Sequence, residues 1–110
     1  MIRPKKLNVL GKEYQVVYTD ELSDRVGHHD PYPAVITLWN GMGDYDMFMT
    51  LLHEVIHAID SMVDINLSET KTSVLAVSFA DFLTRNKIIE LYTFESSGCI
   101  DQLFNDNGVI

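Results

Sequence analysis

Two histidines four residues apart bracket a glutamate in the segment TLLHEVIHAID, residues 50–60. In a helix, positions i and i+4 lie on one face about one turn apart, so His53 and His57 can bind one metal ion from the same side. Glu54 is offset by one residue and can lie beside that metal without ligating it, where a carboxylate can take a proton from activated water. This HExxH spacing predicts a zinc site of the metallopeptidase kind, with Glu54 as general base.

The same segment also allows an interpretation without metal. Apolar residues cover most of the circumference of the expected helix, which is typical of a buried helix, and one polar stripe remains. The stripe consists of Thr50, His53, Glu54, His57, Asp60, Ser61 and Asp64. In this alternative, the two histidines are core residues whose polar atoms are satisfied by Asp60, Asp64 or backbone carbonyl groups.

A catalytic zinc ion has three protein ligands and one open position, so HExxH needs a third partner. The extended pattern HExxHxxGxxH would require glycine at position 60 and histidine at position 63. The chain has Asp60 and Val63 at these places, which excludes that arrangement. Asp60 is two helical turns from His53, so we expect it to orient His57 by a hydrogen bond and not to bind the metal.

Glu69 is the better candidate for the third ligand. Ser68 is expected to cap a second helix that runs to about residue 86, and an antiparallel return of this helix would bring its first turn near the histidines. A carboxylate in the first turn also suits the helix dipole without any metal, and both interpretations stay open. Other acidic and histidine residues are less favoured as ligands: Asp64, Asp81, His28 and His29.

A stabiliser for developing negative charge would be a tyrosine, histidine or arginine near the open side of the metal. The candidates are Tyr45, Tyr92, His28 and His29, and the spacing does not choose among them. His28 and His29 fall in a stretch rich in proline and aspartate, so we expect them to lie in a solvated loop.

The elements that must position these residues predict one α+β domain over residues 1–110. Residues 7–10 and 13–18 are expected to form a hairpin, residues 19–33 a loop, and residues 34–39 (AVITLW) a strand. A helix follows over about residues 44–62, with Asp44 or Asp46 as N-cap, and residues 88–94 are strand or helix. We therefore expect a small, mostly antiparallel sheet packed on two helices, with the metal cleft between residues 34–39 and 44–62.

Composition limits the classes of partner. The chain has 110 residues, 46% of them hydrophobic, and a formal net charge of −8, which makes nucleic acid and anionic membrane surfaces poor partners. Cys99 is the only cysteine, so no internal disulfide can form. The start of the chain lacks an apolar run of signal-peptide length, and no segment approaches the roughly 20 apolar residues of a membrane span. A cytoplasmic location is expected.

The order of these features resembles small phage and prophage proteins of the ImmA/IrrE-like metallopeptidase type, which are zincin-like. The resemblance covers roughly residues 7–85 and is most specific in TLLHEVIHAID and LSETKTSVLA. It implies a minimal zincin-like domain in which His53 and His57 match the zinc ligands and Glu54 the catalytic glutamate. Glu69 matches the first acidic residue after the Leu-Ser pair of the second motif.

The resemblance also implies a phage-encoded Zn²⁺ endopeptidase that hydrolyses a specific protein or peptide in the cytoplasm of the host cell. The chain departs from the pattern at Thr70 and Ser73, where relatives often have glutamate. An alternative function is non-catalytic binding of a host protein on a zincin-like fold, with zinc structural or absent. A purely structural zinc site in a small domain is a third interpretation.

Overall fold

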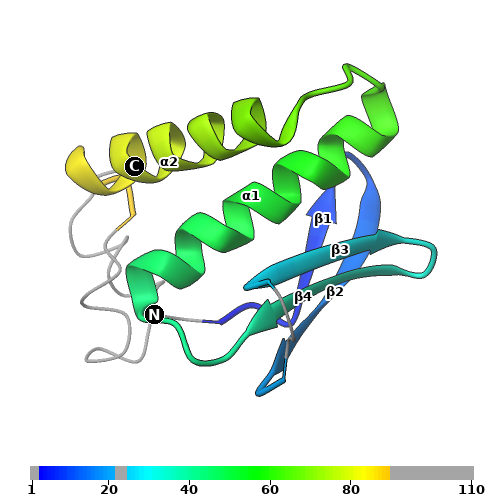
Figure 1. Ribbon diagram of the computed structural model, residues 1–110, viewed down its shortest axis with the longest axis horizontal. Coiled ribbons are helices and arrows are strands. Elements are labelled where there is room, and N and C mark those ends of the chain that lie inside the picture. The colour runs from blue at the N-terminus through cyan, green and yellow to red at the C-terminus, as the bar shows by residue number, and fades with distance from the viewer. Residues whose placement is uncertain (1–2, 22–24, 90–110) are drawn as a thin grey trace.

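The computed structural model describes residues 3–21 and 25–89 and contains four strands and two helices in an α+β arrangement. The elements are β1 (Lys6–Val9), β2 (Lys12–Thr19), β3 (Gly27–Pro31), β4 (Ala34–Trp39), α1 (Asp44–Val63) and α2 (Glu69–Arg85). The strands form one sheet in the order β1-β2-β4-β3. Two of the three pairings are antiparallel and β2–β4 is parallel, so the sheet is mixed (Figure 1). The expected combination of a small sheet and two helices is confirmed.

The predicted hairpin of β1 and β2 is present, and a two-residue turn connects its strands. Leu10 and Gly11 both have positive φ, at 52° and 88°, which is the backbone of a two-residue turn whose twist matches that of the strands. The side-chain oxygen of Asn8 accepts a hydrogen bond of 2.7 Å from the backbone N–H of Gly11.

The expectation of one loop over residues 19–33 is wrong, because Gly27–Pro31 is a strand. β3 pairs antiparallel with β4, with His29 opposite Ile36. The β-branched and aromatic residues of β4 provide a strong pairing partner, and this pairing outweighs the weak strand propensity of the Gly, His, Asp and Pro residues in β3. Pro31 is tolerated because it lies at the end of an edge strand, where no ladder hydrogen bond is lost.

This pairing changes the place of β4 in the fold. β4 lies between β2 and β3 inside the sheet, and β3 is the edge strand that lies beside α1. The expectation that residues 34–39 border the metal cleft is therefore wrong, and β3 takes that position.

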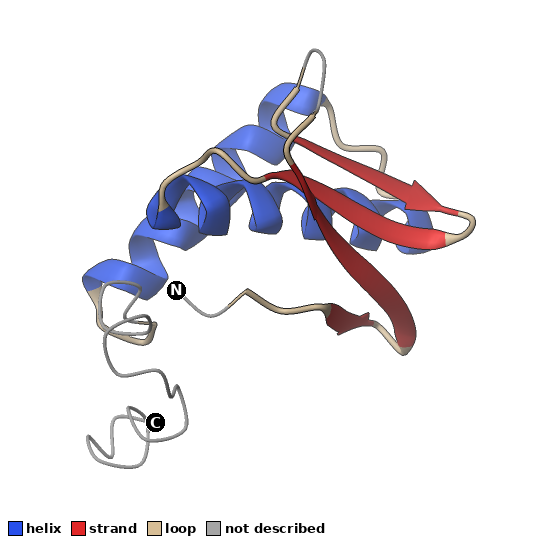
Figure 2. Cartoon of the chain, turned by 90° about the horizontal axis from the view of Figure 1, so that it is seen from below, coloured by secondary structure: helices blue, strands red, loops and turns tan. Residues whose placement is uncertain are grey.

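The core lies between one face of the sheet and α1. The sheet contributes alternate residues, which are buried because successive side chains of a strand point to opposite faces. These are Val9, Tyr14, Val16, Ile36 and Leu38. The helix α1 adds Met47, Phe48, Leu51 and Ala58. Both helices lie on the same side of the sheet, with α2 beyond α1 (Figures 1 and 2).

The helix α2 returns along α1 after a short connection, as expected. Its buried residues are Thr72, Ala76 and Ala80, which recur every four positions and are small enough for the two helices to approach closely. The side chain of Ser68 accepts a hydrogen bond of 3.1 Å from the backbone N–H of Lys71, so the predicted N-cap of this helix is confirmed.

The start of α1 differs from the prediction. Gly43 is the N-cap, without a side-chain hydrogen bond, and Asp44 and Asp46 lie in the first turn. There the two carboxylates still interact favourably with the positive end of the helix dipole.

Over residues 3–21 and 25–89, neither helix combines the length and apolar character needed to cross a membrane. The expectations for Tyr92, for Cys99 and for most of residues 88–94 concern positions outside the described residues.

Candidate metal centre

The three predicted metal ligands, His53, His57 and Glu69, lie close together in the structure. His53 and His57 project from one face of α1, and Glu69 comes from the first turn of α2. The Nε2 atoms of the two histidines are 3.1 Å apart, and His57 Nε2 is 3.2 Å from Glu69 Oε1. Glu69 Oε1 also contacts His53 Nε2. One atom from each residue lies within 4.8 Å of the other two, so the group can hold a metal ion.

The donor set is one that suits a divalent metal ion such as zinc. Zinc bonds of about 2.0–2.1 Å in a tetrahedron separate the ligand atoms by about 3.3 Å. Two of the three separations, 3.1 and 3.2 Å, are close to that value, and the contact between His53 Nε2 and Glu69 Oε1 is closer. Two imidazole nitrogens and one carboxylate oxygen are ligands that zinc accepts, and three protein ligands leave a fourth position open.

Glu69 is a carboxylate whose charge is stabilised by this arrangement. Partial burial raises the pKa of Glu69, but the hydrogen bonds and charges of His57 and His53 outweigh this effect and hold the pKa below its ordinary value. The carboxylate is therefore ionised when both histidines are near it, which is the state that a metal ligand requires.

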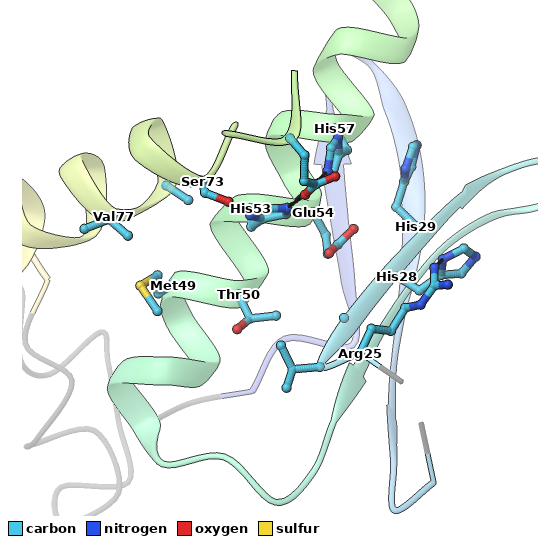
Figure 3. Close-up of a pocket in the computed structure, with 14 residues that line it drawn as sticks. Arg25, His28, His29, Met49, Thr50, His53, Glu54, His57, Ser73 and Val77 are labelled. Carbon is cyan, nitrogen blue, oxygen red and sulfur yellow. Dashed lines mark hydrogen bonds and ion pairs between the residues drawn. The ribbon is translucent and has the colours of Figure 1, made fainter. Parts of the chain in front are cut away.

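Glu54 lies beside the three ligands and is buried, with 7% of its surface exposed. In Figure 3 its carboxylate lies on the side of His53 that faces β3. Burial raises the pKa of Glu54, and the neighbouring charges of His53 and His57 act in the opposite direction. Among the described residues, none forms a hydrogen bond with this carboxylate. The carboxylate is therefore free to exchange a proton with a group bound in the cleft.

Gly27 allows β3 to approach α1 this closely, and sequence reasoning missed it. A Cβ atom at this position would lie 2.7 Å from Thr50 Cγ2 and 3.0 Å from Glu54 Oε2. The glycine falls in the stretch 19–33 that the sequence predicts to be a loop. The signal that could have identified it is a glycine inside a strand, which often marks a close approach of another chain segment.

The two adjacent histidines lie on β3 and not in a solvated loop, so that expectation is wrong. The ring of His29 is parallel to that of His57 within 9°, with centroids 6.2 Å apart. Burial and the charge of His57 lower the pKa of His29, and its buried Nε2 has no hydrogen-bond partner among the described residues. His28 is hydrogen bonded to Arg25 and Asp30, at 3.0 and 3.1 Å.

These residues border one continuous cleft of about 790 Å³ between β3, α1 and α2. The three candidate ligands and Glu54 line this cleft, and Figure 3 shows His53, Glu54 and His57 side by side on α1. Four apolar residues also line the cleft and are called its apolar part: Val26, Met49, Ala76 and Val77. The volume is within the range of about 300–1,000 Å³ that is usual for ligand pockets.

The remaining candidates do not join the cluster. Tyr45 packs against the core, and Asp81 is paired with Arg85. Asp64 is the C-cap of α1. Thr70 is exposed, and Ser73 lines the cleft.

Asp60 does not orient His57, so that expectation is also wrong. Its two carboxylate oxygens accept hydrogen bonds from the backbone N–H groups of Asn66 and Leu67, at 2.7 and 3.0 Å.

Comparison with known proteins gives no assignment for this site. No family model, no curated protein and no solved structure matches the chain.

Proposed function

We propose that this chain is a small zinc metallopeptidase that hydrolyses a protein or peptide substrate in the cleft. The observation that carries the proposal is the buried carboxylate of Glu54 next to the convergent donors His53, His57 and Glu69. The resemblance of residues 50–60 and 67–76 to ImmA/IrrE-like metallopeptidases supports the same activity.

In the proposed reaction, zinc and Glu54 have separate roles. Zinc, when bound, polarises a carbonyl group and lowers the pKa of the attacking water. Glu54 accepts the proton of this water on a carboxylate oxygen and delivers it to the amide nitrogen as the peptide bond breaks. Because burial raises the pKa of Glu54, its carboxylate is a stronger base than an exposed glutamate would be.

The edge of β3 offers a place for the peptide backbone. Among the described strands, β3 pairs with β4 alone, so its other edge is available for hydrogen bonds to an extended chain. A peptide that adds to this edge would run past Glu54, because Gly27 lies against this residue. Such strand addition provides affinity through backbone groups, and specificity then depends on pockets for individual side chains.

The apolar part of the cleft favours a hydrophobic side chain near the bond that is cleaved. Met49 lies one helical turn from His53, a distance of about 5 Å. Val26 and Val77 are 46% and 48% exposed, although both line the cleft. Burying these surfaces against a substrate side chain would be favourable, so we expect a substrate with an aliphatic or aromatic residue at this position.

A second function, non-catalytic binding of a protein partner, is favoured by a different surface. The side of α2 outside the cleft exposes large apolar residues: Val74 is 58% exposed, Phe79 51% and Phe82 54%. Burying these apolar side chains against a protein partner would be favourable. Binding of a partner through α2 does not require Glu54. A substitution of Glu54 therefore distinguishes the two functions.

Glu54→Gln tests the proposed peptidase activity. Glutamine has nearly the same size but cannot accept the proton, so we expect hydrolysis to fall by about 10²–10⁴-fold with zinc content unchanged. The measurement is cleavage of a mixed synthetic peptide library by the zinc-loaded protein, analysed by mass spectrometry. Cleavage by Glu54→Gln at the wild-type rate would contradict the proposal.

A further inference from the structure

We propose that Asp60 is a positioning residue for the third metal ligand, a role that rests on the proposed metal site. Through the connection between the helices, residues 64–67, Asp60 holds the start of α2 so that Glu69 meets His53 and His57. Asp60 would act through the backbone of this connection and would not touch the metal.

Three hydrogen bonds from the connection converge on Asp60. Its backbone oxygen accepts from the N–H of Asp64 at 2.8 Å, as the last bond of α1. Its side-chain oxygens Oδ1 and Oδ2 accept from Asn66 and Leu67, at 2.7 and 3.0 Å. The chain is thus folded back over the final turn of α1 just before Ser68 begins the second helix.

The backbone of the connection needs such support. Asp64 and Asn66 both adopt left-handed conformations, with φ of 55° and 60°. These conformations cost roughly 1–2 kcal/mol for residues other than glycine, although aspartate and asparagine tolerate them best. The side chain of Asp60 stabilises this conformation because it binds the two N–H groups that the turn leaves without a helical partner.

The place of Asp60 in its own helix gives a second argument. A carboxylate in the last turn interacts unfavourably with the negative end of the helix dipole, and the last turn of α1 contains no basic residue to offset it. Asp60 therefore lowers the stability of an isolated α1, and its benefit lies in the contacts with the connection.

The geometry of the cluster makes this contact important for the metal. His53 and His57 come from one helix, so their relative placement depends on α1 alone. Glu69 comes from the other helix, only two residues after Leu67, whose N–H is held by Asp60. A shift of the connection would move Glu69 from the ligand triangle, and sites of this type tolerate displacements of only about 0.5 Å.

The test is a double-mutant cycle read out as zinc affinity. Zinc dissociation constants are measured by competition with a chromophoric chelator for the wild type, Asp60→Ala, Glu69→Gln and the double variant. We expect Asp60→Ala to weaken zinc binding by roughly 10–100-fold, as is common for residues that orient metal ligands. In the Glu69→Gln background, Asp60→Ala should cause little further loss, because the neutral amide of glutamine is a much weaker zinc ligand than a carboxylate and its position then matters little.

Two control variants make the result specific. Asp46→Ala removes a carboxylate from the exposed first turn of α1 and should leave zinc affinity unchanged. Asp60→Asn keeps one acceptor oxygen and should lie between the wild type and Asp60→Ala.

An equal loss in both backgrounds would overturn the inference, since Asp60 would then act on the whole fold. Unchanged affinity in Asp60→Ala, with zinc binding abolished in His53→Ala, would overturn this inference and leave the metal site intact. Failure of the wild type to bind zinc would overturn both.

Discussion

At the scale of single residues, Gly27 decides how closely β3 and α1 approach at Glu54. The space for a side chain at this position is already occupied by Thr50 and Glu54. The carboxylate of Glu54 lies directly against Gly27, since a Cβ atom at position 27 would be only 3.0 Å from Glu54 Oε2. The position of the proposed general base therefore depends on a glycine at position 27, which leaves room for the carboxylate of Glu54.

Gly27→Ala should disturb Glu54 and leave the three ligands in place. The added methyl group would lie 2.7 Å from Thr50 Cγ2, so the side chain of Thr50 or the backbone of β3 must shift. We expect a loss of about 1–3 kcal/mol in the free energy of unfolding, as for other overpacked sites, measured by urea denaturation. Peptide hydrolysis should decrease while zinc content is retained.

Thr50→Ser provides the matched rescue, because serine lacks Cγ2 but keeps the hydroxyl group. The variant that combines Gly27→Ala with Thr50→Ser should recover part of the lost stability. If Gly27→Ala is as stable as the wild type, or if Thr50→Ser gives no recovery, the close contact described here is wrong.

At the scale of elements, the site is an α1–α2 pair to which the edge strand β3 adds one wall. The histidine pair was predictable because the period of a helix fixes the spacing of residues i and i+4. Glu69 was predictable because a short connection returns α2 along α1 and because Ser68 marks its start. These features depend on local sequence signals.

Gly27 and His29 were not predictable in the same way. Residues 27–31 have little strand propensity, and they form β3 because the strand β4 pairs with them. The alternation that points His29 towards α1 follows only after this pairing is known. The position of Asp60 was missed for a similar reason, since its partners Asn66 and Leu67 adopt irregular backbone conformations that helical spacing does not reveal.

Val77→Asp tests the apolar part of the cleft, which is formed across α1 and α2. Acetohydroxamate, which has only the metal-binding group, and leucine hydroxamate, which adds an aliphatic side chain, are suitable probes for the zinc-loaded protein. We expect Val77→Asp to weaken the binding of leucine hydroxamate by roughly 10-fold, because an apolar contact of about 1–2 kcal/mol is lost. Acetohydroxamate binding should not change, and calorimetry measures both.

Val74→Asp is the control, because Val74 is similarly exposed on α2 but does not line the cleft. It should affect neither probe. An equal loss of both probes in Val77→Asp, or the same loss in Val74→Asp, would contradict a hydrophobic subsite.

At the scale of the whole molecule, the core and the metal cluster are separate. The buried cluster of sheet and α1 residues contains none of the three ligands, which are partly or largely exposed. Hydrophobic burial, the main favourable contribution to folding, therefore does not depend on the metal. The chain should fold without zinc, whereas a purely structural zinc site would predict unfolding when a ligand is lost.

The most direct test is the zinc content of purified wild type, His53→Ala and His28→Ala after equilibration with zinc and desalting, measured by inductively coupled plasma mass spectrometry. We predict about one zinc per chain, as in a three-ligand catalytic site, for the wild type and for His28→Ala. His53→Ala should contain no zinc and still unfold cooperatively on heating, as followed by circular dichroism. A wild type without zinc, or zinc retained in His53→Ala, would contradict the metal centre on which the proposed function depends.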